Sequence, residues 1–403
     1  MRNDTSQPII KTLLAQAAQG RSWRTKPSAA PAATYADPEW LAAERRTLFG
    51  PLPQVVALSP DLPEPGSYLT RDNLAVPLLV IRGDDGVVRA FANVCAHRGA
   101  EVVGEERGCS RRFSCAYHAW TYGTDGRLVG LPDRDAFPDI DTPGPGLRTL
   151  PTVEDHGVIW VTPDPAGGPT PRPELGPIAD DLDSFDIGAH RHWRSHRFDL
   201  ALNWKLVIDT FLEPYHFASL HKNTVGPLFI PNLCFAERFG PHVREVLPRR
   251  TLTELGDQPP EQWDLVPHTA LVYVLFPNTV FVMQIDHVET WRVTPDPQDP
   301  GRSVCDLDFY IPDVPTNGPT GERQISEQMS ESAARHWERN WKLTIDTVIE
   351  EDFAAMAGAQ RGLASGALDQ LRFGSNEPAL TMFHEAVADA VDGRDPQSEE
   401  SHV

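Results

Sequence analysis

Two short stretches decide the fold of the first half of the chain: Cys95-Ala96-His97-Arg98-Gly99 and Cys115-Ala116-Tyr117-His118-Ala119-Trp120. In each, a cysteine precedes a histidine by two or three positions and follows a run of strand-forming residues. The tip of a β-hairpin can present two such side chains to one metal centre. We therefore predict that two thiolates and two imidazoles, from Cys95, His97, Cys115 and His118, hold a common centre.

Two kinds of metal centre use this donor set. Tetrahedral zinc accepts two cysteines and two histidines, but zinc-finger spacing groups like ligands, whereas each half here is mixed. In a Rieske [2Fe–2S] cluster two thiolates hold one iron and two imidazoles hold the other. The flanking Arg98-Gly99 and Tyr117-x-x-Trp120 resemble the Rieske signature, so the cluster is favoured and zinc is the alternative. Cys109 is expected to be a packed thiol.

Length and charge restrict the classes of protein. A chain of 403 residues fits two domains. The net charge of −21, without a cluster of basic residues, argues against nucleic acid binding. Five scattered cysteines make a poor disulfide framework. The sequence contains neither a secretory signal nor an apolar run long enough for a membrane span, so we expect a cytoplasmic protein that binds no membrane.

Composition divides the chain into four parts. Residues 1–48 are expected to form a helical segment that packs on the larger domain, with a Pro/Ala linker at 26–34. Residues 49–165 are expected to form a small all-β domain. Its clearest element is a hairpin that joins 75–81 to 87–94 through Gly83-Asp84-Asp85-Gly86. The proline-rich stretch 163–177 marks a boundary, residues 166–392 form the second domain, and 393–403 are expected to be disordered.

The second domain mixes strands with helices. Residues 269–276 and 279–285 are predicted to form a hairpin, and 305–311 continue its sheet. A long helix is predicted from about residue 321 to 356. The expected fold class is α+β.

A second set of metal ligands lies in this domain. In Glu213-Pro214-Tyr215-His216-x4-His221 the histidines are five residues apart, a turn of about 500° in a regular helix. They can converge on one metal only if the helix ends or distorts between them. A ferrous oxygenase site also requires a carboxylate. Asp352 lies on the apolar stripe of the late helix with Ile345, Ile349 and Met356, and is predicted to be the third ligand, whereas Glu350 and Glu351 are expected to be solvated.

Together these motifs resemble the Rieske non-haem iron oxygenases, in particular the α component of ring-hydroxylating and N-demethylating systems. The resemblance extends over nearly the whole chain. It includes Asn203-Trp204-Lys205, Gln360-Arg361-Gly362 and Asn376-Glu377-Pro378-Ala379…Phe383-His384. It implies a small all-β Rieske domain and a larger helix-grip catalytic domain, in which an antiparallel sheet with helices encloses a mononuclear Fe(II).

The resemblance also implies partners. Family members form head-to-tail homotrimers, in some cases with a β-subunit, and take electrons from NAD(P)H through a separate reductase, in some systems with a ferredoxin. This chain has no dinucleotide fingerprint, which agrees with a separate reductase. By resemblance Glu213 is the electron-transfer bridge to His118 of a neighbouring subunit. Many ring dioxygenases have aspartate there, and glutamate is familiar among amine-demethylating members.

The implied reaction is hydroxylation or cis-dihydroxylation of an aromatic or related small organic substrate with O2, as in aromatic catabolism. The alternative is oxidative N-demethylation or hydroxylation of a quaternary ammonium or methylated amine. A Rieske electron carrier without oxygenase chemistry and a zinc-stabilised binding protein are the other hypotheses. Six residues are candidates for the substrate pocket, with Gln284 and His287 as polar contacts: Phe211, Phe217, Leu220, Phe276, Phe281 and Met283.

Overall fold

The computed structural model describes residues 1, 3–20, 24–140, 144–168, 170–313 and 331–394. The chain divides into two compact units, residues 45–173 and residues 1–44 with 174–403. The sequence predicted that the small all-β domain spans residues 49–165, whereas the compact unit spans residues 45–173. Within the described residues, no helix combines the length and the apolar character needed to cross a membrane.

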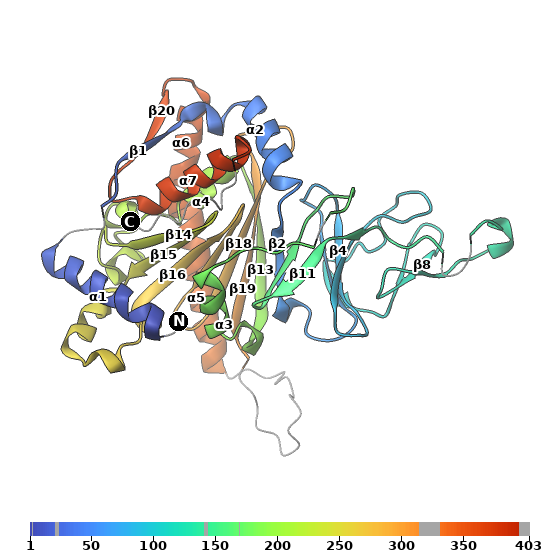
Figure 1. The fold of residues 1–403 in the computed structure, drawn as a ribbon, viewed down its shortest axis with the longest axis horizontal. Coiled ribbons are helices and arrows are strands. Elements are labelled where there is room, and N and C mark those ends of the chain that lie inside the picture. The colour runs from blue at the N-terminus through green and yellow to red at the C-terminus, as the bar shows by residue number, and fades with distance from the viewer. Residues whose placement is uncertain (2, 21–23, 141–143, 169, 314–330, 395–403) are drawn as a thin grey trace, which may run out of the picture. The chain divides into compact units, whose positions relative to one another are not determined.

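The unit 45–173 is built from short antiparallel strands (Figure 1). One sheet has the order β10-β5-β4-β3-β6, a second β11-β12-β2 and a third β7-β8-β9. The strands are β2 Gln54–Leu58, β3 Ser67–Arg71, β4 Leu78–Arg82, β5 Val88–Ala92, β6 Arg107–Cys109, β7 Arg112–Ser114, β8 Thr121–Gly123, β9 Leu128–Gly130, β10 Thr149–Leu150, β11 Thr152–Asp155 and β12 Val158–Val161. The predicted hairpin is confirmed as β4 and β5, which pair from Leu78 opposite Ala92 to Arg82 opposite Val88.

Two hydrophobic clusters fill this unit. One contains Cys95 and Cys115 together with Phe91, Trp120 and Tyr122, so the motif cysteines lie in a core. The other packs side chains of β2, β4 and β12, including Val56, Leu78 and Ile159. Cys109 lies outside both clusters and is exposed, so the expectation of a packed thiol is wrong.

A seven-stranded antiparallel sheet forms the centre of the other unit, with the order β13-β19-β18-β17-β16-β15-β14. Its strands are β13 His190–Leu200, β14 Phe235–Phe239, β15 His242–Pro248, β16 Thr269–Leu275, β17 Thr279–Met283, β18 Val288–Pro295 and β19 Ser303–Pro312. The predicted hairpin is confirmed as β16 and β17, and β19 continues the sheet as expected. Strands β15 to β18 are buried along their whole length, because the sheet is covered on both faces.

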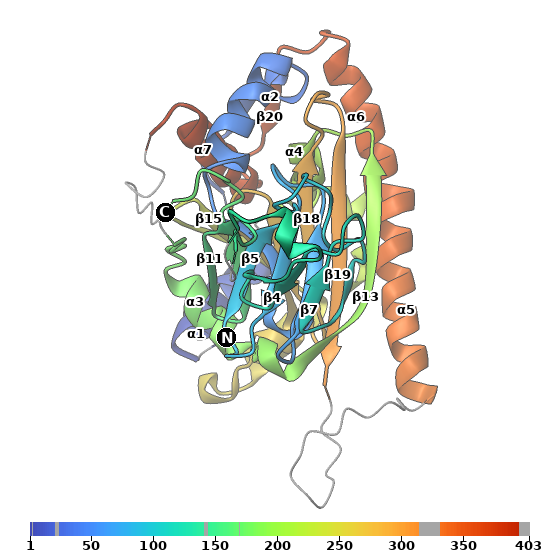
Figure 2. The ribbon, with the colours of Figure 1, turned by 90° about the vertical axis from the view of Figure 1, so that its right-hand side faces the viewer.

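Seven α-helices of this unit lie in the described residues. They are α1 Asn3–Gln19, α2 Pro38–Glu44, α3 Pro177–Ser184, α4 Trp204–Asp209, α5 Glu331–Thr347, α6 Ala354–Ala364 and α7 Pro378–Val391. Helix α7 packs on β14 and β15 (Figure 1), and α5 lies beside β13 (Figure 2). The combination of an antiparallel sheet with helices confirms the α+β class and the helix-grip arrangement.

The late helix ends later than predicted and contains an irregularity. Helix α5 is described from Glu331, and residues 321–330 of the predicted helix lie outside the described residues. The chain then continues without a break through a π-helical segment, Val348–Phe353, into α6, which ends at Ala364. Residues 395–403 of the expected disordered tail also lie outside the described residues.

The predicted linker at 26–34 contains a strand. Strand β1 Ser28–Pro31 pairs antiparallel with β20 Gln370–Phe373. The composition of β1, Ser-Ala-Ala-Pro, carries no strand signal. The segment is a strand because its backbone pairs with residues near the other end of the sequence.

A buried ion pair fixes the segment that leads to the paired histidines. The Lys205 ammonium lies 2.5 Å from the Glu44 carboxylate, and both side chains are almost completely buried. The indole of Trp204 donates to the other oxygen of Glu44 at 2.8 Å. Asn203 caps α4 by accepting from the Lys205 backbone N–H at 3.0 Å. The Asn-Trp-Lys motif therefore anchors the start of α4.

Candidate functional site

His216, His221 and Asp352 converge in the larger unit. Their candidate ligand atoms all lie within 4.8 Å of one another. The two Nε2 atoms are 3.0 Å apart, and Asp352 Oδ1 lies 3.2 Å from Nε2 of His221 and 3.5 Å from Nε2 of His216. Asp352 Oδ1 is buried and makes no hydrogen bond within the described part of the chain. Two imidazoles and one carboxylate are the donor set of mononuclear ferrous oxygenase sites, so these residues fit such an iron.

The local backbone explains how histidines five residues apart can converge. His216 lies in a short 3-10 helix, Tyr215–Ala218, and His221 follows after that helix has ended. The turn closes with the Gly226 N–H donating to the His221 carbonyl at 2.9 Å. A Cβ atom at Gly226 would lie 2.6 Å from the Phe217 carbonyl oxygen and 2.7 Å from that of His221. Only glycine fits there, a requirement that the sequence did not reveal.

The π-helical segment brings Asp352 to the site. A π turn contains one residue more than the α-helical repeat and is frequent at functional sites. Asp352 is 6% exposed, as the inward stripe predicted. Ile349, which was used to define that stripe, is 43% exposed, because the extra residue changes the helical periodicity.

Each of the two histidines uses its second ring nitrogen to contact a carboxylate. Nδ1 of His216 bonds Glu213, and Nδ1 of His221 lies 2.5 Å from Glu351. This contact fixes the tautomer that leaves Nε2 free to bind a metal. The expectation that Glu351 is solvated is therefore wrong. Burial works against ionisation, but hydrogen bonds from His221 and Thr224 hold the pKa of Glu351 below its usual value.

Glu213 is fixed by the segment that it precedes. One carboxylate oxygen contacts the His216 ring, and the other accepts the His216 backbone N–H at 3.1 Å. The side chain is 15% exposed, so one face of the carboxylate remains accessible. The bridging role towards His118 stays a prediction.

The second donor set lies in the 45–173 unit, on two loops of the same form. Cys95 N–H donates to the Ala100 carbonyl and Cys115 N–H to the Trp120 carbonyl. In each loop the residue four after the cysteine has a positive φ and donates back to the cysteine carbonyl; these residues are Gly99 and Ala119. The two loops therefore share one backbone hydrogen-bond pattern around their cysteines.

The four side chains gather at the tips of these loops. The His97 and His118 rings are 4.6 Å apart, and both cysteines are buried. Nδ1 of His97 is buried without a hydrogen-bond partner among the described residues, as expected of a nitrogen positioned to bind a metal. The Tyr122 hydroxyl lies 3.3 Å from the Cys95 sulfur. The donor set and its surroundings fit a Rieske [2Fe–2S] cluster.

A cavity of about 380 Å³ adjoins the three-residue site and includes His221 and Asp352 in its lining. Aromatic and aliphatic side chains form much of its wall: Phe211, Phe217, Val225, Leu228, Phe229, Leu247, Val272, Val282, Trp291, Leu343 and Val348. Its volume is that of a small-molecule site.

The sequence predicted part of this lining. Phe211, Phe217, Gln284 and His287 line the cavity as expected. Leu220, Phe276, Phe281 and Met283 do not, and their prediction is wrong. Side chains alternate between the faces of a strand, so Val282 and Gln284 of the same segment line the cavity instead. Phe281 packs on the opposite face, against Phe185 and Tyr273.

Three titratable groups form a chain on the polar wall of the cavity. His287 contacts Asp286 through Nδ1 at 2.8 Å and Glu289 through Nε2 at 3.1 Å. Burial disfavours a charged imidazole, but these two contacts outweigh it and raise the pKa of His287. Asp286 and Glu289 thus both favour the charged form of the His287 ring.

Family models match both units. A model described as "Ring hydroxylating alpha subunit (catalytic domain)" matches residues 187–393, and one described as "Rieske [2Fe-2S] domain" matches residues 53–151. The first match covers more than half of the chain.

Several curated proteins have similar sequences. The chain is 30% identical to the glycine betaine monooxygenase oxygenase subunit of Chromohalobacter salexigens over 217 residues, 54% of this chain and 48% of that protein. It is 30% identical to the anthranilate 1,2-dioxygenase large subunit of Burkholderia cepacia over 44% of each chain. The chain spans about half the length of the curated relatives it matches.

Solved structures share the fold. A quaternary ammonium Rieske monooxygenase in complex with L-carnitine superposes with a TM-score of 0.72 at 20% identity, covering 91% of this chain and 95% of that one. Naphthalene 1,2-dioxygenase from Rhodococcus sp. bound to indole gives 0.71 at 19% identity, covering 98% and 99%.

Proposed function

The chain belongs to the ring-hydroxylating α subunits that carry a Rieske domain, and from this premise we propose that it is the terminal oxygenase component of a Rieske-type oxygenase system. The observation that carries the proposal is the convergence of His216, His221 and Asp352 beside a substrate-sized cavity. A Rieske electron carrier without oxygenase chemistry would need neither this donor set nor the cavity.

Two sets of residues would hold the metals. Cys95, His97, Cys115 and His118 would hold the cluster, and His216, His221 and Asp352 the mononuclear iron. When bound, these groups supply electron transfer and the activation of dioxygen. Glu213 and Glu351 orient the imidazoles, and the apolar wall positions the substrate and excludes water.

Partners and location are part of the proposal. A separate reductase, with or without a ferredoxin, would deliver electrons from NAD(P)H. Glu213 would pass them from His118 of a neighbouring subunit in a homotrimer. None of the five cysteines forms a disulfide, which agrees with a cytoplasmic protein.

Hydroxylation of an aromatic or related small molecule is the first candidate reaction, because aromatic rings line the cavity. Oxidation of a quaternary ammonium compound is the second. Two observations favour it: relatives include oxygenase subunits of glycine betaine and carnitine monooxygenases, and the Phe211 and Trp291 rings lie 5.1 Å apart on the cavity wall. Such aromatic faces attract quaternary ammonium groups.

The decisive experiment is a metal analysis of the purified chain and two variants. We expect two cluster irons and one further iron per chain, with the visible absorption of a Rieske cluster. Asp352→Ala should lose only the further iron, whereas Glu350→Ala, an exposed neighbour, should keep all three. Two irons in the unaltered chain would indicate a simple electron carrier, and a colourless zinc protein would overturn the proposal. With a reductase and a substrate, oxygen from ¹⁸O2 should appear in the product.

A further inference from the structure

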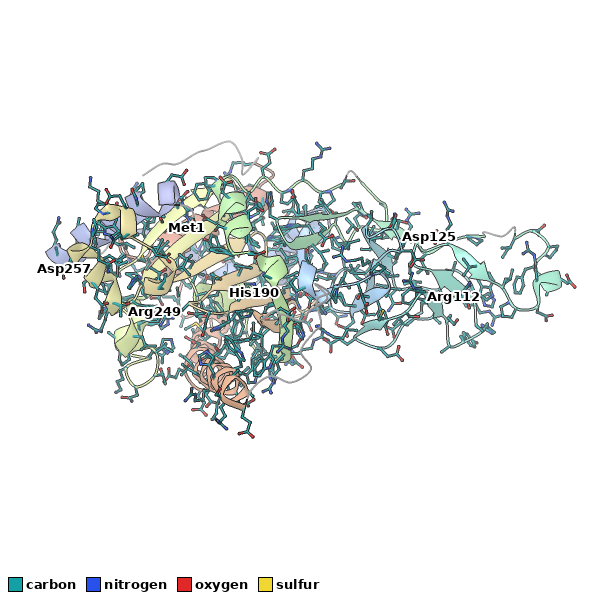
Figure 3. The ribbon with its side chains drawn as sticks, turned by 90° about the horizontal axis from the view of Figure 1, so that it is seen from below. Met1, Arg112, Asp125, His190, Arg249 and Asp257 are labelled. Atoms are coloured by element: carbon teal, nitrogen blue, oxygen red, sulfur yellow. The ribbon has the colours of Figure 1, made fainter. Side chains whose placement is uncertain are left out.

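Arg249 is a cation on the cavity wall and follows β15 directly. Figure 3 labels its side chain. Its Nε donates to the Thr269 carbonyl at 3.3 Å, and Nη2 donates to Gln284 at 2.8 Å. The guanidinium also lies 4.8 Å from the centre of the Phe229 ring. Within the described part of the chain, Arg249 makes no ion pair, and these two hydrogen bonds use two of its five N–H groups.

The carboxylates of the polar wall are already paired. Asp286 accepts from His287 at 2.8 Å and from His336 at 2.6 Å. Glu289 accepts from His287, from the Trp291 indole at 3.0 Å and from the Thr344 hydroxyl at 3.1 Å. Apart from the metal ligand Asp352, the carboxylates of the cavity wall are therefore already hydrogen-bonded, whereas Arg249 still has N–H groups to offer a ligand.

A partly desolvated guanidinium without a counter-ion is unfavourable. Burial lowers the pKa of Arg249, and the nearby Asp286 carboxylate, which makes no direct ion pair with it, only partly opposes this shift. The planar fork of arginine matches a carboxylate in a bidentate arrangement, and such charge-assisted hydrogen bonds are the strongest polar contacts available to a ligand. A carboxylate bound in the cavity would supply the missing partner.

We propose that Arg249 binds a carboxylate group of the substrate, and hence that the substrate is a small organic acid. This inference rests on the proposed function for the statement that the ligand is a substrate. Arg249 and Asp352 line the same cavity, so one molecule can hold its carboxylate at Arg249 while its apolar or cationic part lies among the aromatic rings beside the metal ligands. The proposal applies to both candidate reactions, since an arene and a quaternary ammonium compound can each carry a carboxylate.

The test compares acids with their neutral primary amides on the metal-loaded protein. Benzoate and 4-(trimethylammonio)butanoate represent the two candidate classes, and each is paired with its amide. Dissociation constants are measured by calorimetry for the unaltered chain and for Arg249→Gln, Arg249→Lys and Arg250→Gln. Arg250 is the matched control, because it is adjacent and exposed and contacts the Pro227 carbonyl.

We expect the unaltered chain to bind at least one acid about tenfold or more tightly than its amide. Arg249→Gln should remove this preference, Arg249→Lys should keep part of it, and Arg250→Gln should behave as the unaltered chain. The proposal is overturned if acid and amide bind equally, if no acid binds below about 10 mM, or if Arg249→Gln retains the preference.

The metal content and the reductant-dependent oxygen uptake of the same preparations separate this inference from the proposed function. If three irons and oxygen uptake are found without a preference for the acid, the carboxylate assignment fails and the oxygenase assignment stands. If instead the protein shows an Arg249-dependent preference for the acid but holds no mononuclear iron, the carboxylate assignment stands and the oxygenase assignment fails.

Discussion

Glu213 and Glu351 have the same local task but are proposed to differ in function. Each contacts Nδ1 of one histidine of the iron site, so each fixes a ring orientation. Only Glu213 is proposed to link this site to the cluster of a neighbouring subunit. The two residues therefore form a matched pair for testing the electron path.

Glu213→Gln should leave both metals bound and slow turnover by at least about tenfold, because the amide cannot act as the charged bridge. The rate at which the reduced cluster is reoxidised in the presence of substrate and dioxygen measures this step. Glu351→Gln should weaken iron binding but, once the iron site is filled, leave the reoxidation rate close to that of the unaltered chain. Equal rates for Glu213→Gln and the unaltered protein would show that the bridge is elsewhere.

Lys205 is the residue whose loss should destabilise the larger unit most clearly. Lys205→Met leaves the Glu44 carboxylate buried without its cation, with the Trp40 and Trp204 indoles as the donors that remain. Removal of one member of a buried pair typically costs about 3–5 kcal/mol. Denaturant unfolding, followed by tryptophan fluorescence, should show this loss, and Lys222→Met, at an exposed lysine, should change stability by less than about 0.5 kcal/mol. A small effect of Lys205→Met would mean that the pair gives specificity without net stability.

At the scale of elements, local sequence patterns predicted the hairpins but not all of the pairings. The β4–β5 and β16–β17 hairpins have turn signals between two apolar runs and were predicted correctly. The local sequence predicts a linker at strand β1, because the partner that makes it a strand is distant in sequence. The face of β17 was misjudged because both faces of a buried strand are apolar, so the pattern does not say which one meets the cavity. The role of Glu351 was missed for a similar reason, since a π turn alters the helical periodicity.

The π-helical segment allows a test of that periodicity. Deletion of Glu350 should restore a regular helix and turn Asp352 by roughly 100° relative to α5. We expect loss of the mononuclear iron with retention of the cluster absorption and of the helical circular dichroism. Glu350→Ala keeps the chain length and should retain the iron. A deletion variant with full iron content would show that the π segment does not position Asp352.

At the scale of the whole molecule, both metal-ligand sets could be predicted because each is encoded largely in short local motifs. The cavity could not be predicted in full, since its lining comes from strands β15 to β18, the segment 210–229 and the late helix. Arg249 in particular carries no motif. Its significance arises from the absence of an ion-pair partner within the described residues, which is a property of the folded chain.

The unit 45–173 is one continuous stretch with its own hydrophobic clusters. We therefore predict that residues 45–173, expressed alone, fold and assemble the cluster. The visible absorption and electron paramagnetic resonance of the purified fragment measure this, and the same fragment with His118→Ala should lack both signals. A soluble, colourless fragment after iron–sulfur reconstitution would contradict the prediction.

The pairing of β1 with β20 has a consequence for biosynthesis. Residues 28–31 leave the ribosome early, but their partners at 370–373 follow only after tens of seconds, at about 5–20 residues per second. The stretch from 45 to 173 is translated within that interval. The nascent chain therefore exposes all four cluster ligands well before Asp352 exists, and the translation order itself sets which metal site can be filled first.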